Sequence, residues 1–100
     1  MKLNIELIFD PDCPNAELAR RHLRQALASA GLAPVWREWN RGSQQVPAYA
    51  RACGSPTILI NGQDVAEAAP GETQQCRLYR DEDGLLIGAP SVNVICRALE

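Results

Sequence analysis

The chain has 100 residues, of which 46% are hydrophobic and 22% are charged, and its formal net charge is −2. This length and composition predict one globular domain over residues 1–100. The ten basic residues are scattered rather than clustered, so we expect no nucleic-acid partner. No apolar run reaches the length of a transmembrane helix, and we expect no membrane partner.

The first part of the chain alternates predicted strands and helices. Apolar residues at every second position predict a strand over residues 3–9, and a second strand is predicted over residues 34–40. Between them, apolar residues at steps of three or four predict a helix over residues 14–30, which Gly31 ends. This order favours two parallel strands joined by a right-handed helical crossover.

A single cysteine, Cys13, stands between the first predicted strand and the first predicted helix. The start of a helix presents unpaired N–H groups and partial positive charge, and both favour a thiolate, the nucleophilic form of cysteine. Asp10 and Asp12 oppose the thiolate by like-charge repulsion, and the sequence does not decide which effect is larger. Cys13 is therefore the first candidate for chemistry.

A short helix is predicted next within residues 44–53, and Pro47 favours a start near that position. A β-hairpin is predicted over residues 57–65. Its turn is Asn61-Gly62, the dipeptide that gives the strongest short-range hairpin signal. The two hairpin strands run antiparallel to each other.

The stretch before the last helix is polar and is predicted as an insert over residues 66–90. Within it, residues 76–80 are expected to be extended and Asp83-Gly84 to form a turn. Ser91 is predicted to cap a final helix over residues 92–99. The sequence therefore predicts an α/β fold with the element order β-α-β-α-β-β-α.

This order resembles the thioredoxin-like superfamily, with Cys13-Pro14 at the first helix and Ser55-Pro56-Thr57 before the third strand. The resemblance implies a three-layer sandwich around a four-stranded mixed sheet, with the insert before the last helix. It also implies a cis peptide bond before Pro56, which would face Cys13. By the same resemblance, Pro14, Ser55, Pro56 and Thr57 are expected to contact the substrate.

The departure from the superfamily pattern is also informative. Ala16 stands where redox members usually carry a second cysteine, so a dithiol cycle cannot close within the motif. The chain is also similar to a group of small bacterial thioredoxin-like proteins with a single such cysteine, often labelled alkylmercury-lyase-like. This similarity rests on the Phe9–Pro14 start, on Gly-Ser-Pro-Thr-Ile-Leu-Ile-Asn-Gly at 54–62, and on the runs at 76–79 and 88–91.

Within the implied fold, three cysteines converge on one rim of the sheet. The first strand ends near Cys13, the second helix delivers Cys53 to the same edge, and the loop leading to Cys76 starts there. Cys76 lies in a polar stretch where core filling is less natural, so it is the preferred partner for Cys13, with Cys53 as the alternative. Cys96 lies on the apolar stripe of the last helix and is expected to be a core residue.

The leading hypothesis is a thiol–disulfide oxidoreductase in which Cys13 attacks a disulfide or glutathione adduct, and Cys76, Cys53 or an external thiol resolves the product. Its partner would be a protein bearing a disulfide or thiol, or a small thiol, and no cofactor is expected. A second hypothesis is that Cys13 with Cys76 or Cys53 binds a soft metal ion. A third is a non-catalytic binding module. The N-terminal residues do not resemble a signal peptide, which favours a cytoplasmic protein with reduced thiols.

Overall fold

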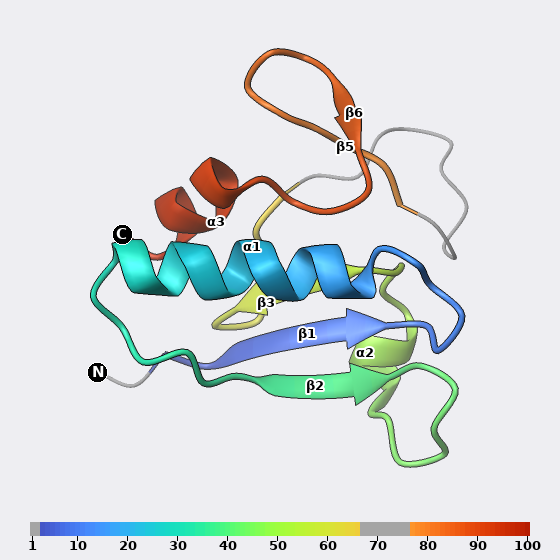
Figure 1. Ribbon diagram of the computed structural model, residues 1–100. Helices are drawn as coiled ribbons and strands as arrows, with labels where there is room; N and C mark the ends of the chain where they lie inside the picture. The colour runs from blue at the N-terminus through green and yellow to red at the C-terminus, as the bar shows by residue number, and fades with distance from the viewer. Residues whose placement is uncertain (1–2, 67–76) are drawn as a thin grey trace.

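In the computed structural model, which describes residues 3–66 and 77–100, a four-stranded mixed sheet is flanked by three helices. A separate two-stranded ribbon lies beyond the sheet (Figure 1). In chain order the elements are β1 Ile5–Phe9, α1 Ala16–Ser29, β2 Arg37–Asn40, α2 Ala48–Arg51, β3 Thr57–Ile60, β4 Gln63–Asp64, β5 Tyr79–Arg80, β6 Leu86–Ile87 and α3 Val92–Ala98.

The strand order in the sheet is β2-β1-β3-β4. β1 runs parallel to β2, with Leu7 opposite Glu38, and antiparallel to β3, with Leu7 opposite Ile58. The predicted parallel crossover and the predicted antiparallel hairpin are both confirmed. β1 is buried on both faces because it is an interior strand, which explains why Ile8 breaks its polar alternation.

The β3–β4 hairpin turns at Asn61 and Gly62, both with positive φ, 53° and 83°. Glycine adopts this conformation without steric cost, and asparagine tolerates it better than most residues. Asn61 also ties the turn to the start of β1. Its side-chain oxygen accepts the Asn4 N–H at 2.9 Å, and its own N–H donates to the Asn4 carbonyl at 2.8 Å.

Two apolar clusters lie on opposite faces of the sheet. The larger one joins β1 and β3 to α1 and α3, and its fully buried side chains include Leu7, Leu23 and Leu27. The smaller one joins Ile8 and Leu59 to α2 and the residues before it. The ribbon diagram shows the same arrangement, with α1 and α3 on one side of the sheet and α2 near the end of β1 (Figure 1). Burying each leucine contributes roughly 2 kcal/mol, so the larger cluster dominates the stability of the fold.

The structure shifts several predicted boundaries. The second strand begins at Arg37 rather than at residue 34, because Val35 is 72% exposed and precedes the paired residues. The short helix spans only Ala48–Arg51. The first helix begins at Ala16, so Cys13 lies three residues before it rather than at its first turn.

The end of the predicted insert has regular structure of its own. β5 and β6 pair antiparallel, with Tyr79 opposite Ile87, and Gly84 turns between them with a φ of 82°. The cap of the last helix is confirmed, because the Ser91 hydroxyl accepts the Val94 N–H at 3.2 Å. No helix within residues 3–66 and 77–100 has the length and apolar character needed to cross a membrane.

Candidate functional site

Asp10, directly after β1, bonds to both parts of the predicted site, the Cys13 turn and the segment before β3. Its N–H donates to the Ser55 hydroxyl at 2.8 Å, and its carbonyl accepts the Cys13 N–H at 3.0 Å. The end of β1 also lies beside the start of β3, since Ile8 pairs with Thr57. The turn that carries Cys13 is therefore joined through one residue to the segment before β3. The peptide bond between Ser55 and Pro56 is cis, as expected.

Cys13 is a half-buried free thiol in the turn between β1 and α1. Its carbonyl accepts the Ala16 N–H at 3.4 Å, so Pro14 and Asn15 separate it from the helix. Pro14, the residue after it, is exposed. Asn15 packs closely against Gly88, where an added Cβ would come within 2.3 Å of its side chain. The segment before α3 therefore packs directly behind the Cys13 turn.

Arg41 neutralises Asp10, one of the two acids in the turn before Cys13. Its Nη1 donates to both carboxylate oxygens of Asp10, at 2.9 and 2.8 Å, and the two side chains are 13% and 22% exposed. The guanidinium group also donates to the Arg51 carbonyl at the end of α2, at 3.3 and 3.4 Å. The repulsion from Asp10 that the sequence suggested is thus offset by a paired cation.

Cys53 lies just beyond α2 and is a different kind of thiol. It packs against the smaller apolar cluster, and its Sγ donates to the Tyr49 carbonyl at 3.3 Å. Burial, and next the negative charge of Asp64, raise the pKa of the Cys53 thiol above its ordinary value. Cys53 therefore favours the protonated form.

Of the remaining two cysteines, Cys96 lies within the described residues and Cys76 does not. Cys96 packs against the larger apolar cluster from α3, as expected of a core residue. Cys76 lies outside the described residues, so its predicted role remains a prediction. Cys13, Cys53 and Cys96 form no disulfide with one another. In the described ranges, no three His, Cys, Asp or Glu side chains come together in a way that could hold a metal ion.

The three residues expected to contact the substrate before and at β3 are buried. Ser55 and Thr57 have no exposed surface, and Pro56 is less than 2% exposed. Their oxygen atoms are used within the chain. The Ser55 carbonyl accepts the Arg77 N–H at 2.9 Å, and the Pro56 carbonyl accepts the Tyr79 hydroxyl. Their contact with a substrate remains a prediction. In this structure their role is structural, since they are buried and bonded to residues 77–79 at the start of β3.

Arg77 is a functional candidate that sequence reasoning missed. It is only 4% exposed, and its Nη1 donates to Thr57 Oγ1 and to Asp64 Oδ2, each at 2.7 Å. Its guanidinium carbon lies 4.6 Å from the centre of the Tyr79 ring, and its Nε is a buried donor with no partner in the described structure. Arginine is seldom buried unless paired, and no sequence pattern marks the pairing partners of Arg77.

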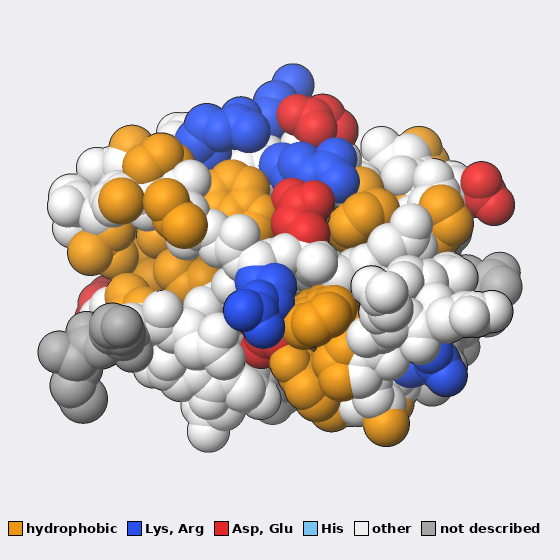
Figure 2. All heavy atoms as spheres, turned by 90° about the horizontal axis from the view of Figure 1, so that it is seen from below, with side chains coloured by type: hydrophobic (Ala, Val, Ile, Leu, Met, Phe, Trp, Pro, Cys, Tyr) orange, Lys and Arg blue, Asp and Glu red, His pale blue; other side chains and the backbone are white. Residues whose placement is uncertain are grey.

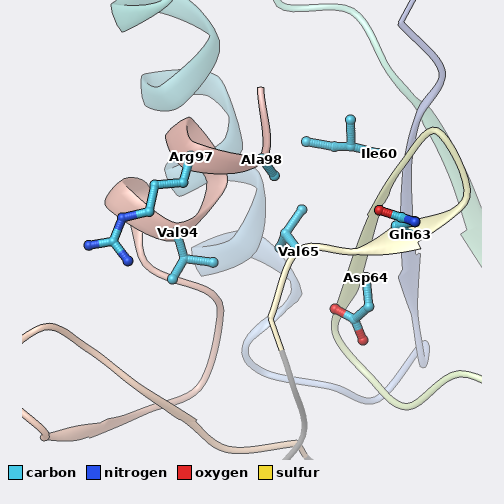
Figure 3. A pocket seen from close by; sticks show the side chains of 7 residues that line it. All are labelled: Ile60, Gln63, Asp64, Val65, Val94, Arg97 and Ala98. Atoms are coloured by element: carbon cyan, nitrogen blue, oxygen red, sulfur yellow. The ribbon is translucent and has the colours of Figure 1, made fainter. Parts of the chain in front are cut away.

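A cavity of about 330 Å³ lies between β4 and α3 (Figure 3). Its walls are mainly aliphatic, with polar and charged groups at the rim. None of the predicted site residues that the structure describes is among those that line it. The lining residues are Ile60, Gln63, Asp64, Val65, Val94, Arg97 and Ala98. The cavity is thus separate from the Cys13 turn, and Asp64 connects it with Arg77.

Seen from below the view of Figure 1, the molecule shows acidic and basic side chains beside hydrophobic ones (Figure 2). Among the described ion pairs, Arg20 of α1 bonds to Glu38 of β2 at 2.8 Å.

Comparisons of the chain with protein-family models, with curated proteins and with solved structures found no match. The geometry of the chain's own residues therefore carries the functional argument.

Proposed function

We propose that this protein is a thioredoxin-like thiol–disulfide oxidoreductase of the cytoplasm, with Cys13 as the nucleophile. The observation that carries the proposal is the linkage through Asp10, which joins the Cys13 turn to Ser55 at the edge where β1 ends and β3 begins. The element order and the helices on both faces of the sheet support the thioredoxin-like arrangement.

The proposed reaction is a disulfide exchange in two steps. The Cys13 thiolate attacks one sulfur of a substrate R–S–S–R′, a bond forms between Cys13 and R–S, and R′–S⁻ leaves. A second thiolate then attacks the Cys13 sulfur of this mixed disulfide, releases R–S⁻ and becomes disulfide-bonded to Cys13. The substrate disulfide has taken up two electrons, and Cys13 and the second thiol have supplied them.

The structure favours some sources of the second thiol over others. Cys53 is a weak candidate because burial raises the pKa of its thiol and its sulfur already donates to Tyr49. A thiol that stays protonated attacks slowly, since the thiolate is the nucleophile. The second thiolate is therefore assigned to Cys76 or to an external small thiol.

The test is to expose the reduced protein to oxidised glutathione and to map the adducts by mass spectrometry. The parent is expected to gain glutathione at Cys13, and Cys13→Ser is expected to lose this rapid adduct. Cys53→Ser is the matched control, because it removes another half-buried thiol and should leave the Cys13 adduct unchanged. Equal uptake of glutathione by the parent and Cys13→Ser, at other cysteines, would end the proposal.

A further inference from the structure

The chain itself occupies the backbone acceptors beside Pro56. The Arg77 N–H donates to the Ser55 carbonyl at 2.9 Å, and the Tyr79 hydroxyl donates to the Pro56 carbonyl. Ser55 and Pro56 have almost no exposed surface. We call residues 77–79 the strap, because they lie across the segment before β3.

The strap bonds to the residues directly before β3, beyond the end of the β3–β4 pairing. Among the described residues, that pairing extends toward the start of β3 as far as Ile58, whose carbonyl accepts the Val65 N–H at 3.1 Å. An extended polypeptide binds beside a strand by main-chain hydrogen bonds, and it needs free acceptors and donors there. Before Ile58, the acceptors of Ser55 and Pro56 are already taken by the strap.

The strap is held in place by a buried cation. The Arg77 guanidinium group bonds to Thr57 Oγ1 and Asp64 Oδ2, and it also donates to the Ala66 carbonyl at 3.2 Å. The same guanidinium group lies over the ring of Tyr79. These contacts come from β3, from β4 and the residues after it, and from the strap itself, so displacing the strap would break all of them together.

We infer that Arg77 and Tyr79 determine the substrate class of the proposed reaction. By occupying the acceptors of Ser55 and Pro56, they deny an extended polypeptide the hydrogen bonds beside Pro56. Cys13 then exchanges with small disulfides, which need no backbone pairing. A polypeptide chain around the reacting sulfur does not increase the rate of exchange. This inference rests on the proposed function, and it narrows a substrate range that included both proteins and small thiols.

The experiment compares two substrates that share a leaving group. One is the thionitrobenzoate mixed disulfide of free cysteine, and the other is the same derivative of a short extended peptide with one cysteine. In each, the Cys13 thiolate bonds to the cysteine sulfur and releases coloured thionitrobenzoate, which follows the rate. The parent is expected to react with the peptide derivative no more than about twofold faster than with the cysteine derivative, because no backbone hydrogen bond is gained.

Tyr79→Ala removes both the ring and the hydroxyl that cover Pro56, and thermal unfolding checks that the variant folds. It is expected to raise the ratio of peptide rate to cysteine rate about fivefold, the value of roughly one net hydrogen bond, and to leave the cysteine rate unchanged. Tyr49→Ala is the matched control. It removes a tyrosine that donates to Glu6 and should leave the ratio as in the parent. Arg77→Ala, which releases the guanidinium contacts, should raise the ratio further where thermal unfolding shows it folded.

Two results would overturn the inference. One is a parent that already prefers the peptide derivative by about tenfold, the gain expected from more than one backbone hydrogen bond. The other is a folded Tyr79→Ala variant, or a folded Arg77→Ala variant, whose ratio equals that of the parent. A third result, thionitrobenzoate release that is the same in the parent and in Cys13→Ser, would instead overturn the proposed function and the inference with it.

Discussion

Cys13 and Cys53 are both half-buried free thiols, yet their surroundings differ. Cys13 lies in a turn whose neighbouring acid, Asp10, is paired with Arg41. Cys53 lies against an apolar cluster, its sulfur donates to a carbonyl, and burial raises the pKa of its thiol. The contrast shows that two thiols of similar exposure can differ in the charges and hydrogen bonds around them. Those surroundings govern the reactivity of a cysteine, so exposure alone does not rank the two.

The largest expected effect concerns the step after Cys13 has reacted. In Cys76→Ser, the mixed disulfide on Cys13 should persist at least about tenfold longer than in the parent, because the preferred internal thiol is gone and thiolate attack is required. In Cys53→Ser its lifetime should be unchanged. Mass spectrometry after removal of free glutathione measures both lifetimes. A longer lifetime in Cys53→Ser alone would reverse the assigned roles of the two cysteines.

A smaller effect is expected from the ion pair beside Cys13. Arg41→Gln leaves the Asp10 carboxylate without its cation, so alkylation of Cys13 by iodoacetamide should slow about threefold at neutral pH. Arg41→Lys keeps the positive charge and should restore most of the rate, even though it loses the guanidinium contacts to the Arg51 carbonyl. Equal slowing in both variants would show that Arg41 acts by shape rather than by charge.

The smallest effect is a pH dependence of stability that Cys53 contributes. Its pKa is raised in the folded state, so the folded chain keeps this proton at pH values where the unfolded chain has lost it. The contribution is therefore complete below the ordinary thiol pKa and is lost as the pH rises through the raised value. Urea unfolding should show a shallower alkaline decline for Cys53→Ala than for the parent. Parallel declines would mean that the folded environment of Cys53 does not hold its proton.

Much of the fold could be predicted because its signals are local. The alternation in β1, the apolar stripe of α1 and the Asn61-Gly62 turn each depend on neighbouring residues. The boundaries were less predictable where tertiary pairing decides them. Val35 has a strand-forming side chain, yet it lies outside β2 because β1 pairs only from Arg37 onward.

The candidate site was only partly predictable, for a related reason. Cys13 and Pro56 could be found because each follows a recognisable local pattern. The Asp10–Arg41 pair spans 31 residues, and the bond from Arg77 to Thr57 spans 20. Local sequence patterns do not predict such contacts. From the sequence, Asp10 is therefore expected to be an unpaired acid, and nothing indicates that Arg77 is buried.

We expect Cys13 to be the most reactive thiol among the cysteines that the structure describes. Limited alkylation of the native protein, followed by mass spectrometry of each cysteine-containing peptide, measures this directly. Cys13 should be modified first, well ahead of Cys53 and Cys96, and the modification of Cys53 should approach that of Cys13 only as the pH rises. Modification of Cys53 before Cys13 at neutral pH would show that Cys13 is not the nucleophile.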